Sequence, residues 1–121
     1  MALSKGQEHL KESVGIVQQM LQALSGERGD DGPLSDGKGA LERVLTTLDG
    51  LEDSFFLKSN LCLYFTKRLL TATERTKRAL DDALVGDGGA PPSLERAIPR
   101  LIKAAETLAD RAQMRDGVTL T

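Results

Sequence analysis

Hydrophobic residues in the first part of the chain recur at the spacing of an α-helix. Successive members of this stripe lie three, four or seven residues apart: Leu3, Leu10, Val14, Val17, Leu21 and Leu24. Because an α-helix completes a turn every 3.6 residues, positions with these spacings share one face. The pattern predicts a first helix from about Ser4 to Leu24.

A second stripe with the same period runs from Leu41 to Ala83 and is broken only at Lys58. Its phase is continuous enough for one long helix over residues 40–85. The alternative is two helices separated by a turn. Gly50 is suited to a left-handed helix C-cap, with Asp53 or Ser54 starting the next helix.

Lys58-Ser59-Asn60 offers a second place for that turn, with Ser59 or Asn60 as the new N-cap. The sequence leaves both positions, and the uninterrupted helix, open.

The last helix is predicted to begin at Ser93, after the glycine- and proline-rich segment VGDGGAPP. Pro99 either kinks this helix or marks its true start, and Gly117 is expected to end it. We expect flexible loops at 25–39 and 86–92 and a frayed tail at 117–121. The hydrophobic stripe of this helix consists of Leu94, Ile98, Leu101, Ala105, Leu108 and Ala112.

These elements predict an all-α fold, because no segment alternates polar and apolar residues as a strand does. Residues 1–121 are expected to form a single domain, an antiparallel helical bundle. It has four helices if the chain turns near residue 50 or 58. Otherwise it has three, with one long central helix whose open side requires a second chain, so we expect a dimer.

The composition excludes several classes of protein. Apolar residues make up 40% of the chain and charged residues 28%, as in ordinary globular proteins. The formal net charge of −2 provides no overall field to attract nucleic acid or an anionic membrane. No apolar run approaches the ~20 residues of a membrane span. A lone cysteine and the lack of a secretory signal predict a cytoplasmic protein.

Few residues offer catalytic or ligand-binding chemistry. His9, the sole histidine, is expected on an exposed flank of the first helix, and Cys62 falls on the apolar stripe as a small core residue. The chain shows no combination of serine, histidine and acid with a local signature, so we expect no enzyme and no cofactor or metal.

The spacing between Gly32 and Gly37-Lys38 resembles that of a phosphate-binding loop. Gly39, however, stands where the magnesium-binding hydroxyl belongs, and no strand precedes, so we expect no nucleotide.

Two basic stripes offer a place for a polyanion to bind. If they adjoin in the bundle, an anion can dock between them by charge pairing. No aromatic residues alternate with these cations for base stacking, so nucleic acid is disfavoured. The six candidate anion-binding residues are Arg68, Arg75, Arg78, Arg96, Arg100 and Lys103.

The segment SFFLKSNLCLYF, residues 54–65, contains every aromatic residue of the chain. Its apolar side chains point in nearly all directions around a helix, so they need cover on all sides. Either the chain turns here and directs them inward, or another molecule covers them. The candidate partner-binding residues are Phe55, Phe56, Leu57, Leu61, Tyr64 and Phe65.

Together these patterns predict a non-enzymatic helical module for protein–protein interaction or dimerisation, with an adaptor or regulatory role. The alternative is a helical bundle that binds a small ligand or polyanion through the basic stripes or an aromatic-lined pocket.

Overall fold

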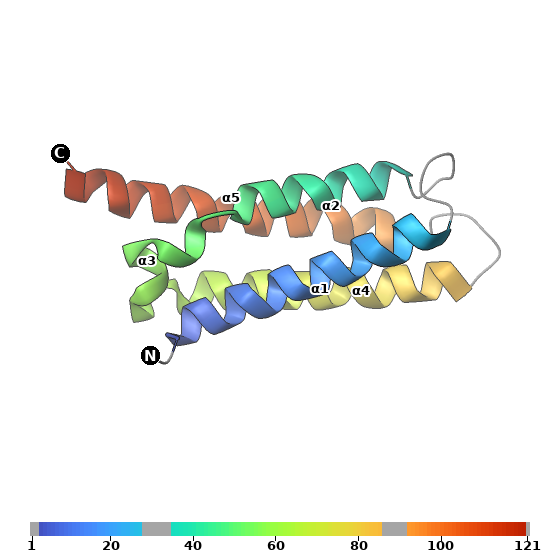
Figure 1. Ribbon diagram of the computed structural model, residues 1–121, viewed down its shortest axis with the longest axis horizontal. Helices are drawn as coiled ribbons and strands as arrows, with labels where there is room; N and C mark the ends of the chain where they lie inside the picture. Colours follow the sequence, from blue (N-terminus) through green and yellow to red (C-terminus); the bar gives the residue numbers. More distant parts are fainter. Residues whose placement is uncertain (1–2, 28–34, 86–91, 121) are drawn as a thin grey trace.

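The computed structural model describes the backbone of residues 3–27, 35–85 and 92–120, and these are helical with short connections and no strand. Four main helices pack side by side (Figure 1). The all-α prediction is confirmed, and of the two predicted arrangements the four-helix one is confirmed, not the one with a long central helix. The main helices are α1 (Lys5–Glu27), α2 (Ser35–Leu48), α4 (Leu63–Val85) and α5 (Pro92–Leu120).

Successive main helices run in opposite directions, as predicted, and are arranged as two hairpins, α1 with α2 and α4 with α5 (Figure 1). The hairpins pack with α1 beside α4 and α2 beside α5. Since α2 and α4 therefore stand on a diagonal, the chain between them crosses one end of the bundle.

The crossing segment uses both break signals found in the sequence. Gly50 takes a left-handed conformation (φ 80°) beyond the end of α2, and the Ser54 hydroxyl accepts a hydrogen bond from the Leu57 amide at 3.2 Å. Ser59 then accepts one from the Leu61 amide at 3.3 Å. The two turns that were alternatives in the sequence thus both occur. Three short helices fill the segment: η1 (Leu51–Asp53), α3 (Phe55–Lys58) and η2 (Asn60–Cys62).

Polar contacts fasten the crossing segment to the start of α1. The Ser4 hydroxyl accepts a hydrogen bond from the Gln7 amide and donates one to the Leu57 carbonyl at 2.7 Å. The Gln7 side chain accepts from the Ser4 amide and donates to the Glu52 carbonyl at 2.8 Å. This reciprocal capping of α1 thus also positions the chain between α2 and α4.

The first predicted loop was too long. Helix α1 continues to Glu27 and α2 begins at Ser35, so part of 25–39 is helical and 28–34 lie outside the described residues. The sequence Ser35-Asp36 places an acidic residue in the first turn of α2, a position where acidic residues are enriched. For the second loop, α4 ends at Val85 and residues 86–91 are likewise not described.

The C-terminal helix is longer than its pattern predicted. Helix α5 begins at Pro92, accommodates Pro99 and continues past Gly117 to Leu120, so the described part of the tail, 117–120, is helical. A single glycine costs a helix only about 1 kcal/mol, too little to end it when its neighbours remain helical.

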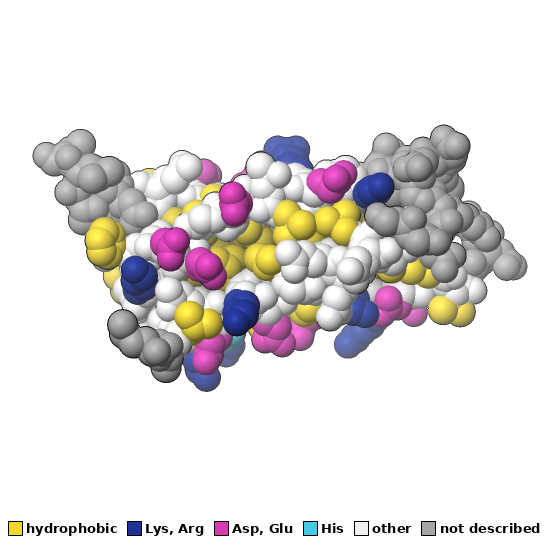
Figure 2. All heavy atoms as spheres, in the orientation of Figure 1, with side chains coloured by type: hydrophobic (Ala, Val, Ile, Leu, Met, Phe, Trp, Pro, Cys, Tyr) yellow, Lys and Arg dark blue, Asp and Glu magenta, His cyan; other side chains and the backbone are white. Residues whose placement is uncertain are grey.

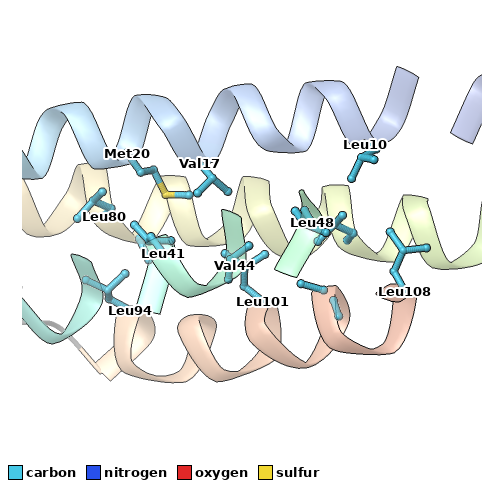
Figure 3. Packing of buried hydrophobic residues seen from close by; sticks show 14 of the residues in the cluster. Leu10, Val17, Met20, Leu41, Val44, Leu48, Leu80, Leu94, Leu101 and Leu108 are labelled. Carbon is cyan, nitrogen blue, oxygen red and sulfur yellow. The ribbon is translucent and has the colours of Figure 1, made fainter. Parts of the chain in front are cut away.

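The core lies along the axis of the bundle and draws on all four main helices (Figure 3). Leu101 and Leu108 of α5 are fully buried; Leu101 lies next to Val44 of α2, and Leu108 lies farther along the bundle (Figure 3). The buried face of α1 is rotated from the predicted stripe: Met20 is buried, whereas Val14 and Leu21 are only half-buried. Leu3 precedes the helix and is 40% exposed.

Helices α1 and α4 pack against each other and bury several small residues, which we call the α1–α4 seam: Gly6, Ser13, Thr66, Thr73 and Thr76. The hydroxyls of Thr73 and Thr76 donate to carbonyls of their own helix at 2.8 Å, so burial leaves them satisfied. A Cβ at Gly6 would overlap the Cys62 sulfur and lie 2.8 Å from the Leu57 carbonyl oxygen. Only glycine therefore fits there.

His9 was predicted on an exposed flank, and this was wrong. It is half-buried at the edge of the seam, where its Nδ1 forms a 3.1 Å hydrogen bond with the Thr66 hydroxyl. Small residues bring α1 and α4 close enough for the ring to reach across.

Candidate anion-binding groove and aromatic end

The two basic stripes lie next to each other in the structure and line one groove. Since α4 and α5 are antiparallel neighbours, the stripe on each helix faces the same gap. The groove has a volume of about 910 Å³. Its cationic side chains are Arg68 and Arg75 from α4 and Arg96, Arg100 and Lys103 from α5. We call this the basic groove.

The charge of the basic groove is of one sign. Among the described residues no acidic side chain lines it, and all five cationic side chains are exposed. Within the described part of the chain, none of the five forms a hydrogen bond or ion pair. Ion pairs form elsewhere, between Arg43 and Glu106 at 2.7 Å and between Lys77 and Asp81 at 2.9 Å. The groove thus presents positive charge that these acidic groups do not neutralise.

Arg78, the sixth predicted residue, is exposed but does not line the groove. Three residues beyond Arg75, it is rotated by about 60° around the helix axis, away from the gap. The seven-residue spacing of Arg68 and Arg75 therefore predicted the groove lining correctly, whereas the three-residue spacing from Arg75 to Arg78 did not.

The floor of the groove consists of small residues that were not predicted as part of a site. Four alanines, two from each helix, lie there with Thr71 and Ser93: Ala72, Ala79, Ala97 and Ala104. On each helix the two alanines are seven residues apart, so both rows run along the groove. This spacing was visible in the sequence, but it is shared with ordinary core positions.

The predicted aromatic surface is divided by the turn in the chain. Phe56 and Leu57 are buried in the core, with exposures of 5% and 0%, and so present no surface to a partner. Phe65 is half-buried, 5.9 Å from the Phe56 ring centre to centre, with the Arg111 guanidinium 5.3 Å from its centroid. This half of the cluster is covered by the chain itself.

The other half of the cluster is exposed. Phe55, Leu61 and Tyr64 are each more than 60% exposed. They lie on or next to the crossing segment, at the end of the bundle where α1 begins (Figure 1). We call these three residues the aromatic end.

A second groove occupies the opposite face, between α1 and α2 (Figure 2). Its floor consists of larger apolar residues such as Val14 and Leu45, and Lys11 lies on its rim together with Asp49 and Glu52. Mixed charge gives this face no preference for one sign of ligand.

The other candidate chemistry is absent from the described residues or blocked. Burial raises the pKa of the Cys62 thiol from its ordinary value of 9.0, and the sulfur donates to the Ser59 carbonyl at 3.1 Å, so this cysteine is a neutral core residue. No three metal-binding side chains gather among the residues described. Of the phosphate-loop spacing, Gly37 and Lys38 lie within α2, whereas Gly32 lies outside the described residues.

Comparisons with known proteins provide no family for this chain. No protein-family model, curated protein or solved structure matches it. Over residues 3–27, 35–85 and 92–120, no helix has the length and apolar character to cross a membrane.

Proposed function

We propose that this chain is a non-enzymatic binding module whose basic groove takes up an anionic partner. The observation that carries the proposal is that five cationic side chains from two helices converge on one groove, whose described lining contains no acidic residue. Like charges held together repel one another, and an anion bound between them removes that repulsion and gains charge-assisted hydrogen bonds.

The proposed site attracts anions only over a short distance. The net charge of the chain is −2, so the molecule as a whole does not attract anions. Within about 8 Å, the screening length at physiological salt, a ligand in the groove experiences mainly the five nearby cations. A partner must therefore place its negative charge inside the groove.

Binding of a flexible polyanion tests this proposal. Fluorescence anisotropy with labelled poly-L-glutamate of about 20 residues should detect binding that weakens as NaCl is raised. The double variant Arg75→Gln/Arg100→Gln should bind about tenfold more weakly, since each exposed ion pair contributes up to about 1 kcal/mol. Arg78→Gln is the matched control and should bind as the wild type does. Equal affinity in all three proteins would rule out the basic groove as the site.

A second candidate function is contact with a protein, including another copy of this chain, through the aromatic end. It is supported by the exposure of Phe55 (69%), Leu61 (61%) and Tyr64 (68%), since large aromatic and aliphatic side chains anchor protein interfaces. Light scattering at micromolar concentration should give a mass above that of the monomer, and Phe55→Ser/Tyr64→Ser should reduce it. A monomeric wild type would exclude self-association.

The proposal includes a cytoplasmic location and an adaptor role. The single, buried Cys62 supports a reducing compartment, because it provides no structural disulfide within the chain. Fluorescence microscopy of the tagged chain checks the location: diffuse cytoplasmic signal is expected, and signal confined to a secretory compartment would contradict it.

A further inference from the structure

The shape of the basic groove restricts what can occupy it. On α4 the lining extends from Arg68 to Ala79, and on α5 from Ser93 to Ala104. Each span covers eleven residue steps, or about 16 Å at 1.5 Å per step. The site is therefore an elongated trough between two antiparallel helices, with a length of about three helical turns.

The floor of the trough can receive another helix. Ala72 and Ala79 on one side, and Ala97 and Ala104 on the other, repeat every seven residues, the spacing at which a helix presents the same face. Small residues at the contact allow helix axes to approach to the lower end of the usual 8–10 Å range. Ala72 and Ala97, which are half-buried, offer apolar surface to pack against, whereas Ala79 and Ala104 lie deeper, with exposures of 6% and 3%. None of the four has a large side chain that would fill the trough.

The walls of the trough determine the charge of that helix. Cations line both sides of the floor, Arg68 and Arg75 along α4 and the others along α5. A helix lying on the alanines therefore needs carboxylates on both flanks of its apolar stripe. Four of the five cations are arginines, whose guanidinium groups pair with carboxylates through two parallel hydrogen bonds.

Nucleic acid suits the trough less well. No aromatic side chain lines it, so bases find nothing to stack on. A phosphate backbone would use the cations and leave the apolar floor without a matching surface.

We infer that the occupant of the basic groove is an acidic amphipathic α-helix of a protein partner, about three turns long. The inference rests on the proposed function, because it specifies the anion that the groove binds. The partner helix carries a narrow apolar stripe of residues at positions i, i+3 or i+4, and i+7, with Asp or Glu on either side.

The test compares two labelled 18-residue peptides of identical composition, rich in Glu, Leu and Ala. In one the leucines share a helical face. In the other they are scrambled around the helix. Fluorescence anisotropy with the full chain should give at least tenfold tighter binding for the amphipathic peptide, and circular dichroism should show that it gains helix on binding.

Two variants fill the floor while keeping all five cations: Ala97→Leu and, independently, Ala72→Leu. Each should abolish the preference for the amphipathic peptide and leave the affinity for poly-L-glutamate unchanged. Ala109→Leu, the same change on α5 outside the groove, should alter neither affinity. Circular dichroism of each variant confirms that it is folded.

The outcomes separate the inference from the proposed function. Equal binding of the two peptides, or an undiminished preference in both floor variants, overturns the inference while leaving anion binding intact. Tighter binding of a 20-nucleotide single-stranded DNA than of the amphipathic peptide also overturns it, in favour of nucleic acid. If neither the peptides nor poly-L-glutamate bind, the proposed function fails as well.

Discussion

Helix α4 has small residues on two sides, and the two sides differ in how far these residues are buried. Toward the interior of the bundle, where α1 packs against α4, Thr73 and Thr76 are fully buried. Toward the basic groove, Ala72 is half-buried and Thr71 is exposed on an open floor. The small residues of the seam are fully buried, whereas those of the groove are buried only in part: Ala79 is 6% exposed and Ala72 is half-buried.

This difference in burial indicates two effects of small residues on the packing of α4. In the α1–α4 seam, small side chains let a helix approach until Gly6 touches the crossing segment. In the basic groove, small side chains leave room between α4 and α5, and the proposed function assigns this room to a chain with negative charge. The covered seam is thus a model for how a partner helix would lie on the open row.

The largest effect should come from adding one carbon atom to the covered seam. Gly6→Ala places a methyl group against the Cys62 sulfur and the Leu57 carbonyl, and should lower the free energy of unfolding by about 2–3 kcal/mol. Gly15→Ala is the matched control, since nothing lies within 4 Å of its added Cβ. It should stabilise α1 by up to about 1 kcal/mol. Urea denaturation measures both, and an undiminished stability of Gly6→Ala would contradict the close contact.

Adjacent residues on α4 sharpen the comparison. Thr73→Leu overfills the seam and should cost about 1–3 kcal/mol in urea denaturation. Ala72→Leu, one residue earlier and facing the groove, should change stability by less than about 0.5 kcal/mol. If the two substitutions cost the same, the two sides of α4 are not packed differently.

A smaller effect concerns pH and Cys62 beneath Gly6. Burial raises the pKa of this thiol in the folded protein, so the unfolded chain loses its proton first as the pH rises. The contribution of the Cys62 thiol to the free energy of unfolding is complete below about pH 9, the ordinary pKa of the thiol, and declines at higher pH. The stability difference between wild type and Cys62→Ala should therefore shrink from pH 8 to pH 10. A constant difference would show that the thiol is solvated.

The smallest effect should come from the groove of the free protein. Arg75→Gln removes one of five mutually repelling cations and should raise the free energy of unfolding by a few tenths of a kcal/mol. The gain should fade in 1 M NaCl, where charges separated by more than about 3 Å are screened. A loss of stability would mean that Arg75 has an acidic partner.

Helical periodicity was enough to predict the fold class and the core of the last helix. Leu94, Leu101 and Leu108 were placed on one face, and all are buried. The position of the turn in the crossing segment was harder to predict, because Gly50 and Ser59 are equally well suited to interrupt a helix. Only the diagonal arrangement of α2 and α4 requires the chain to use both.

The basic groove was predictable in part. Seven-residue spacing placed Arg68 and Arg75 on one side of a helix, but whether α4 adjoins α5 is a property of the tertiary packing. For the same reason, sequence patterns could not show that Phe56 faces the core while Phe55 faces solvent. Neighbouring hydrophobic residues acquire different roles only when the turn is in place.

The most direct test of the central claim, that the basic groove is the binding site, is an NMR titration of the ¹⁵N-labelled full chain with poly-L-glutamate. We predict that the largest amide shift changes occur in residues 68–79 and 93–104. The α1–α2 groove, residues 10–18 and 45–52, should remain unchanged. Shift changes centred on the α1–α2 groove, or spread evenly over the molecule, would contradict the account.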